Sequence, residues 1–523
     1  MARFNKKQTI VTTPADTTNY EGAPAFKMDD KTTLYTQVCA CLWGEPSFYD
    51  ATGERESNII TLIHKIGATD PEWLMKLAVY ARETMHLRSV PVVILAEMAA
   101  HKEYKDKPKP WIVKWGERII PRADEMGELL AYYTSKFGKK IPNSIKNVIE
   151  KRLLSLSEYD VSKYAGNKGW KMHDIVNYIH PKPLNEKQEM LFGYIVGKNK
   201  ADEKTLPLLY ARDEFLKKTE LDEEALGLIQ KGSITWETAI SKFGNNANVW
   251  DALDIPIMAS IRNIRNIVNS EASLDPVISK LNDANIVRKS KMFPYRFWQA
   301  YKIVCEMFMQ TSKIGMALDN ALAVSSTIID KLDGKSLICI DHSGSMDSDG
   351  VNYIRNTSQT TLFEKACVLG VAASFISPNN DIYLFGETTK KANVLNNKHS
   401  TFINRMNLLQ QIDVGHSTLA HLPIDVAVTG NAFYDRIFVF SDMQCYAHKY
   451  NTSLYDSIKE YRKKVNKNVR VISVDLAGHG TSQVSYKESN TLLLSGFSEN
   501  LFRLVQSWEQ SSRDAVEMIS QLK

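Results

Sequence analysis

The residues of this sequence best suited to chemistry are oxygen-bearing side chains in short loops. Asp341 is followed by hydroxyl residues at alternate positions, Ser343 and Ser345. Alternate residues of an extended turn point the same way, so these three side chains can converge on one point. Carboxylates and hydroxyls are hard ligands that suit Mg²⁺, Ca²⁺ or Mn²⁺ better than Zn²⁺. We therefore expect a divalent cation here, with Mg²⁺ as the first choice.

Two later loops offer ligands of the same kind. The stretch 415–418 reads Gly-His-Ser-Thr and provides a further hydroxyl, from Ser417 or Thr418. An apolar run that ends at Ser441 is followed by a second carboxylate, Asp442. Together these loops predict one metal centre.

The elements around these loops predict that they meet. Residues 331–523 alternate between short apolar runs and helical patterns, which is typical of a doubly wound parallel sheet. In such a sheet ligands bind beyond the carboxyl ends of the strands, where all three loops would lie. The expected strands are 336–340, 381–385, 435–440 and 469–474, and the expected helices are 362–375, 453–464 and 500–523.

Residues 30–330 follow a different pattern, that of short helices. Asp70 and Pro71 are typical of a helix start, and apolar residues then recur at three- and four-residue steps up to Ala81. About 300 residues of short helices usually form stacked helix pairs, as a solenoid or a closed ring. No clear sequence period accompanies this pattern.

Composition sets outer bounds on the function. The chain has 523 residues, 44% hydrophobic and 24% charged, as ordinary globular proteins do. No apolar run approaches the ~20 residues of a membrane span, and the start has no signal-peptide pattern. Six cysteines form no disulfide framework. We therefore expect a cytoplasmic protein with no membrane partner. The net charge of +5 is too mild to indicate nucleic acid by itself.

Local clusters point more directly to nucleic acid. Residues 161–183 mix lysines with tyrosine, tryptophan and histidine, which offer phosphate contacts and stacking faces for a single strand. Arg262 and Arg265 are about one turn apart, on one face of an expected helix. Solvated helix faces with buried aromatic residues would explain the same composition.

The exact residues of these stretches resemble a known family. Lys163-Tyr164, Gly169-Trp170 and the His-Pro-Lys-Pro of 180–183, followed by Phe-Pro-Tyr-Arg at 293–296, closely resemble the RNA-binding TROVE module of the Ro autoantigen family. The Asp-x-Ser-x-Ser, Thr and Asp pattern resembles the metal-ion-dependent adhesion site of von Willebrand factor A domains, which follow TROVE modules in that family. The chain is identified as a bacterial or phage-type Ro homologue.

The resemblance implies a fold and a division of the chain. The expected fold is an α-helical repeat (HEAT-like) ring followed by an α/β doubly wound parallel-sheet von Willebrand A domain. The expected parts are an N-terminal extension, a TROVE RNA-binding module and an A-like domain, at residues 1–29, 30–330 and 331–523. A monomer is expected.

The resemblance also implies ligands and partners. Ser343, Ser345 and Thr418 would bind the metal directly, Asp341 and Asp442 would bind it through water, and one position would stay open for an acidic group of a protein ligand. The implied RNA partners are small non-coding RNA like Y RNA and the single-stranded 3′ ends of misfolded RNA. The implied process is RNA quality control, in which bacterial members of the family can act together with an exoribonuclease. The implied RNA-contact residues are Lys163, Lys168, His180, Lys182, Arg262 and Arg265.

Two other functions compete with a non-catalytic RNA-binding protein. One is a metal-dependent scaffold that binds a protein through the adhesion site. The other is a metal-dependent hydrolase, with His342 or His416 as its base. The sequence lacks Gly-x-Ser-x-Gly, His-Glu-x-x-His, Walker A and Gly-x-Gly-x-x-Gly motifs, so we expect no enzyme.

Overall fold

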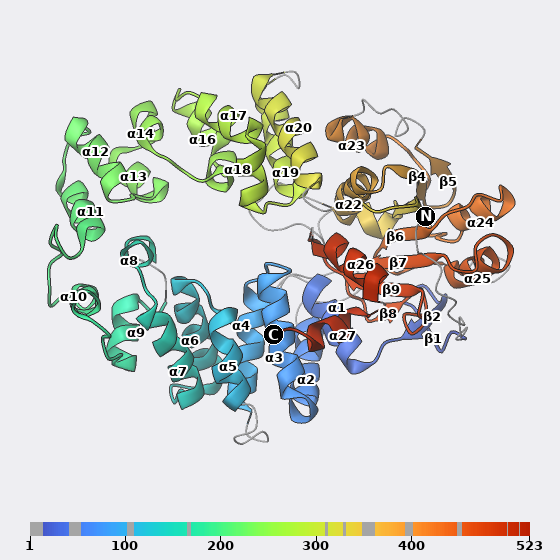
Figure 1. Cartoon of the computed structure of the whole chain (residues 1–523), viewed down its shortest axis with the longest axis horizontal. Helices are drawn as coiled ribbons and strands as arrows, with labels where there is room; N and C mark the ends of the chain where they lie inside the picture. The colour runs from blue at the N-terminus through green and yellow to red at the C-terminus, as the bar shows by residue number, and fades with distance from the viewer. Residues whose placement is uncertain are drawn as a thin grey trace. The chain divides into compact units, whose positions relative to one another are not determined.

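The computed structural model divides into two compact units. One combines Met1–Leu62 and Thr84–Leu87 with Val287–Lys523, and the other combines Ile63–Glu83 with Arg88–Ile286 (Figure 1). The structure describes residues 14–40, 54–101, 109–164, 169–308, 312–327, 331–347, 361–392, 401–446, 452–498, 500–511 and 513–523.

The second unit is helical throughout its described residues. Helix α3 packs against α4 and α5, α4 packs against α6, and α5 packs against α7, so each helix contacts others within the next few positions of the chain. This is the stacking expected of consecutive helix pairs. The helices are α3 (Pro71–Glu83), α4 (Ser89–Ala100), α5 (Lys109–Ile119), α6 (Ala123–Phe137), α7 (Asn143–Leu154), α8 (Glu158–Tyr164), α9 (Met172–Ile179), α10 (Glu186–Ile195), α11 (Pro207–Lys217), α12 (Glu223–Lys231), α13 (Trp236–Phe243), α14 (Ala247–Ala252), α15 (Ile257–Arg262), α16 (Ile264–Asn269) and α17 (Asp275–Asn282).

The start of α3 shows why the helical prediction succeeds. The Asp70 carboxylate accepts a hydrogen bond of 3.1 Å from the Trp73 amide, which satisfies a free donor of the first turn. Trp73, Leu74 and Leu77 are buried on one face. Met75, Val79 and Tyr80 are buried as well, so α3 packs on more than the single face that the spacing predicts.

The first unit holds a six-stranded sheet in the order β5-β4-β3-β6-β7-β9. All neighbours are parallel except β5, which pairs antiparallel with β4. The expectation of a doubly wound parallel sheet in this region is therefore confirmed. The strands are β3 (Lys335–Asp341), β4 (Asn379–Phe385), β5 (Thr389–Lys391), β6 (Arg436–Ser441), β7 (Arg470–Asp475) and β9 (Thr491–Ser495).

Helices cover both faces of this sheet. On β3, Leu337 and Cys339 join a core with α24 and α25, whereas Ile338 and Ile340 face α22. Phe438 of β6 meets Phe502 of α26 on that second side. The helices around the sheet are α21 (Gly344–Asp347), α22 (Leu362–Ile376), α23 (Phe402–Gln410), α24 (Leu422–Thr429), α25 (Leu454–Lys464), α26 (Asn500–Ser511) and α27 (Ala515–Ser520).

The same unit includes elements from earlier in the chain. Strands β1 (Thr17–Thr18) and β2 (Pro24–Lys27) form a hairpin whose second strand pairs antiparallel with β8 (Thr481–Ser482). Helix α1 (Asp30–Ala40) contacts β9 and α27. Helices α19 (Pro294–Met307) and α20 (Lys313–Ser326) also belong to this unit, and the division between the two units falls within α2 (Glu54–Thr69) and α18 (Ala284–Ser290). Among the described helices, none combines the length and the apolar character needed to cross a membrane.

Two details of this unit differ from the sequence prediction. The single closing helix expected over 500–523 is wrong, because Asp514 begins a new helix by accepting a hydrogen bond from the Glu517 amide. The strands β5 and β9 were not predicted. They are the two edge strands of the sheet, of three and five residues.

We expect one buried ion pair to control the stability of this sheet. Arg436 of β6 is fully buried and binds Glu509 of α26 through bonds of 2.8 and 2.9 Å. Replacing Glu509 with alanine leaves a buried guanidinium without its counter-ion and should cost about 3–5 kcal/mol. Hydrogen exchange of the β6 amides measures this loss. Glu517→Ala, at the half-exposed Arg513 pair, is the matched control, and equal β6 protection in both variants would contradict the prediction.

Candidate functional site

The first predicted loop leaves the sheet at the end of β3. Asp341 is its last residue, and the Asp341 carboxylate accepts bonds from the Ser343 amide at 3.0 Å and the Ser441 hydroxyl at 2.7 Å. The Ser343 and Ser345 hydroxyls lie 3.3 Å apart. All of these side chains are buried. The expected convergence of Asp341, Ser343 and Ser345 is therefore seen in the structure.

The second and third loops are tied to the first by backbone hydrogen bonds. The Gly344 amide donates to the His416 carbonyl at 2.9 Å, and the Tyr446 amide donates to the Thr418 carbonyl at 2.9 Å. A Cβ atom on Gly386, which follows β4, would collide with the Gly415 carbonyl, so the close approach of this loop requires glycine. The three loops thus gather at the carboxyl edge of the sheet, with Thr418 buried.

Three buried carboxylates lie at this edge: Asp341, Asp442 and, at the end of β7, Asp475, whose pKa burial raises to about 6. Burial, followed by the negative charge of Asp442, raises the pKa of Asp341 to about 7, although hydrogen bonds from Ser441 and Ser343 act the other way. Asp442 is fully buried, and its Oδ1 accepts a 3.0 Å bond from the Gln444 amide. Its Oδ2 has no hydrogen-bond partner among the described residues.

This donor set fits a divalent cation. An unsatisfied carboxylate oxygen beside a second carboxylate and three hydroxyl residues offers hard ligands and excess negative charge. In the described parts of the chain, no group of three or more His, Cys, Asp or Glu side chains is placed to hold a metal, so thiolate or imidazole centres find no match there. If the centre binds Mg²⁺, the residues that would hold it are Asp341, Ser343, Ser345, Thr418 and Asp442.

The two histidines beside these loops differ in environment. His342 is stacked on Phe363 with ring centroids 3.6 Å apart, and its Nδ1 lies 3.1 Å from the Ile412 carbonyl. Burial lowers the pKa of His342. Its ring is therefore held by packing, whereas His416 is exposed.

The helical unit presents a surface of cations beside aromatic rings, formed by parts of α6 to α9. Lys163 Nζ lies 5.5 Å from the Tyr159 ring and 5.4 Å from the Tyr164 ring. Partial burial opposes the charge of Lys163, but the two tyrosine hydroxyls outweigh it and raise its pKa. Two cations on this surface, Arg122 over Tyr164 and Lys146 over Tyr178, were not predicted.

The aromatic residues of this surface are held by α6 and α9. Trp170 and Tyr178 meet edge to face, with centroids 5.6 Å apart. A Cβ atom on Gly127 of α6 would lie 2.9 Å from the Trp170 carbonyl oxygen, so glycine permits this approach. His180 ends α9 in the left-handed conformation and, like Lys182, is exposed. Lys168 lies outside the described residues.

Arg262 and Arg265 are exposed, but their expected arrangement is wrong. The predicted single helix is interrupted at Asn263, so that Arg262 ends α15 and Arg265 lies on α16. Asn263 is buried and its side chain donates to the Ala259 carbonyl, which competes with continuation of the helix. Within this unit, α16 lies away from α8 and α9 (Figure 1).

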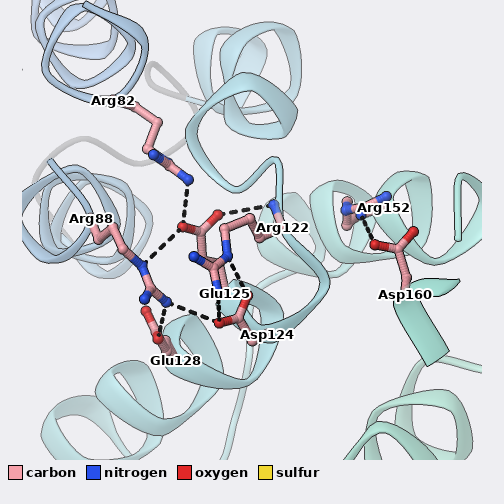
Figure 2. Close-up of polar contacts among 8 residues, drawn as sticks. All are labelled: Arg82, Arg88, Arg122, Asp124, Glu125, Glu128, Arg152 and Asp160. Carbon is pink, nitrogen blue, oxygen red and sulfur yellow. Dashed lines mark hydrogen bonds and ion pairs between the residues drawn. The ribbon is translucent and has the colours of Figure 1, made fainter. Parts of the chain in front are cut away.

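Several arginines near the cation–aromatic surface are already paired with acids. Glu125 is fully buried and accepts from Arg82 at 2.7 Å, with Arg88 3.5 Å away, while Arg122 binds Asp124 (Figure 2). Carboxylates neutralise these guanidinium groups. The resulting ion pairs join α3, α4 and α6 and add no net positive charge to the cation–aromatic surface. A similar pair, Arg152 and Asp160, joins α7 to α8.

Comparisons with known proteins identify the family to which this chain belongs. The model described as the TROVE domain matches residues 24–233 and 228–329, and the model described as the Ro60 vWA domain matches residues 335–509. The chain belongs to the TROVE family. TROVE relatives of the Ro type are RNA-binding proteins, so the predicted family and the predicted A domain are both confirmed.

Individual TROVE relatives are distant. The chain is 20% identical over 343 residues to telomerase protein component 1 of Mus musculus and over 334 residues to that of Rattus norvegicus. These matches cover 54% and 52% of this chain, but only 13% of either relative. The crystal structure of the Deinococcus radiodurans Ro (RSR) protein matches with a TM-score of 0.67 at 16% identity, covering 93% of this chain and all of that one, which supports the fold.

The buried carboxylates of this TROVE protein predict a pH dependence without divalent metal. The pKa of Asp341 is raised above its ordinary value of 3.8 to about 7, so the folded state binds a proton that the unfolded state releases between these pH values. Stability should therefore fall as pH rises from about 4 to 7 and level off above that. Asp341→Asn should remove the part of this dependence above about pH 6, while Asp475, whose pKa burial raises to about 6, keeps the part below it, and the variant should have a higher melting temperature at pH 8 in EDTA. Parallel melting curves of both proteins from pH 5 to 8 would contradict this assignment.

Proposed function

We propose that this protein binds small non-coding RNA like Y RNA and the unpaired 3′ ends of misfolded RNA, and acts in cytoplasmic RNA quality control without catalysing a reaction. The observation that carries the proposal is the exposed cation–aromatic surface of α6 to α9 within the region that the TROVE model matches. Family membership supports RNA as the ligand, and the surface suggests which part of the RNA it contacts.

Chemistry favours an unpaired strand at this surface. Splayed bases can stack on rings such as Tyr159, whose side chain is 41% exposed, while lysines neutralise the phosphates between them. A rigid A-form duplex hides its base edges in a deep, narrow groove and offers mainly its backbone. His180 and Lys182, both exposed after α9, would extend this contact.

Competition between a hairpin with a single-stranded tail and a blunt hairpin tests the proposal. A hairpin with a free single-stranded 3′ tail should outcompete a blunt hairpin of equal nucleotide number at near-physiological salt. Equal nucleotide number matters because counterion release alone would favour the longer molecule. The measurement is competition filter binding. Equal competition, or preference for the blunt hairpin, would leave only general polyanion binding and would favour the protein-scaffold function.

Two lysine variants, measured in the same binding assay, test whether Lys163 contacts a phosphate of the RNA. Lys163→Gln should reduce the slope of log affinity against log salt by about one unit if Lys163 makes one phosphate contact. Lys217→Gln is the matched control, because Lys217 is exposed but already paired with Glu214. Indistinguishable slopes for the two variants would remove Lys163 from the interface.

The A domain supports a second, compatible proposal, a metal-dependent protein-binding site. The unsatisfied Asp442 Oδ2 favours Mg²⁺ at the sheet edge, with Ca²⁺ or Mn²⁺ as alternatives. A bound cation attracts an acidic group, so the protein ligand would offer a carboxylate, and an exoribonuclease is one candidate. The protein would act as a monomer with separate RNA and protein partners.

Metal binding can be tested directly. Asp442→Ala should abolish Mg²⁺ binding in calorimetry while tailed RNA still binds, because Lys163 and its aromatic neighbours are in the other unit. Asp347→Ala is a matched control, since Asp347 is exposed at the end of α21 and outside the proposed ligand set. Unaltered Mg²⁺ binding in both Asp341→Ala and Asp442→Ala would place the metal elsewhere.

A further inference from the structure

The hairpin of β1 and β2 is built into the A-domain unit. Its turn is closed by Asn19, whose Oδ1 accepts a 2.9 Å hydrogen bond from the Ala23 amide. Phe26 of β2 is buried and pairs in register with Ser482 of β8. The Phe26 ring also meets Tyr455 of α25 edge to face, with centroids 4.8 Å apart. The hairpin therefore packs on the A-domain unit through β8 and α25.

The turn of this hairpin contacts the third loop of the metal centre. The Asn19 side-chain amide donates to the Cys445 carbonyl at 2.7 Å, and the Tyr20 backbone amide donates to Gln444 Oε1 at 2.9 Å. Asn19 and Gln444 are buried, so water does not readily replace these bonds. Gln444 in turn donates its backbone amide to Asp442 Oδ1. A short chain of hydrogen bonds thus joins the hairpin to a proposed metal ligand.

The backbone of that loop is strained where the hairpin packs on it. Met443, between Asp442 and Gln444, has a φ of 67°, in the left-handed region that a long side chain rarely adopts. Its buried side chain forms a small apolar cluster with Leu493 of β9 and Met28, which directly follows β2. Such a conformation persists only when its surroundings hold it. The hairpin supplies part of that hold, by packing through Met28 and by hydrogen bonding through Asn19 and Tyr20.

We propose that the β1–β2 hairpin is a positioning element of the metal centre. It holds residues 442–446 in the conformation that aims Asp442 at the cation and, through the Tyr446 amide, fixes the Thr418 loop beside it. Docking of the hairpin and binding of the metal then stabilise each other, because coupling between two binding events is reciprocal. This inference rests on the proposed metal centre and extends it to residues far from the adhesion motif.

Two variants of the full chain separate positioning from general stability. Asn19→Ala removes the bond to Cys445, and Met28→Ala removes the packing on Met443. Each should weaken Mg²⁺ binding in calorimetry by about tenfold, the usual effect of losing one buried contact. Thr18→Ala, at an exposed position of β1, is the matched control and should bind Mg²⁺ as the wild type does. Circular dichroism in EDTA confirms that each variant is folded.

Hydrogen exchange on the unaltered protein provides an independent readout. Saturating Mg²⁺ should slow exchange of the Tyr20 and Ala23 amides, which are bonded within the docked turn. Wild-type Mg²⁺ affinity in both folded variants, or exchange in the turn that Mg²⁺ does not change, would overturn the positioning role while leaving the metal centre intact. Absence of Mg²⁺ binding to the wild type would instead overturn the metal centre, and the positioning role with it.

Discussion

The burial of two carboxylates side by side is the constraint on which the A-domain edge depends. Asp341 and Asp442 are both fully buried at the ends of neighbouring strands, where burial and the charge of Asp442 raise the pKa of Asp341. Hydrogen bonds from Ser441 and the Gln444 amide reduce this cost but leave one oxygen without a partner. A fold retains such a cost where it serves a ligand, and a divalent cation is the ligand that would remove it.

The helical unit uses charge in the opposite way. Its candidate contact residues are exposed or partly exposed, and Lys146 and Lys163 lie beside aromatic rings. The buried charges of the same helices, such as Glu125 with Arg82, are matched within the unit and join helices together. Individual exposed contacts are weak, so affinity at such a surface comes from many of them acting at once.

The predictable part of the fold is the part encoded over short stretches of chain. Apolar runs identified β3, β4, β6 and β7, and the position of Asp341 directly after one run located the first loop of the site. The helix break at Asp514 was readable in principle, because Asp followed three residues later by Glu is typical of a helix start. The break at Asn263 was not readable, since it depends on burial of that side chain among its neighbours.

The unpredictable part of the site is what the packing of distant segments creates. Arg122 and Lys146 join the cation–aromatic surface because α6 and α7 pack against α8 and α9, and no pattern around either residue indicates this. The hairpin is a stronger case, since Asn19 and Cys445 are 426 positions apart.

The contacts between the hairpin and residues 442–446 connect the conformation of this loop to a distant part of the chain. Sequence motifs identify the proposed ligands Asp341, Ser343, Ser345, Thr418 and Asp442, but Met443, with its strained conformation, packs on residues outside the adhesion motif. The loop is therefore not autonomous. A fragment cut at residue 331 would keep every proposed ligand and lose the hairpin that packs on the loop. The adhesion motif thus accounts for which residues are the proposed ligands. The geometry of the third loop depends also on the hairpin, which lies outside the motif.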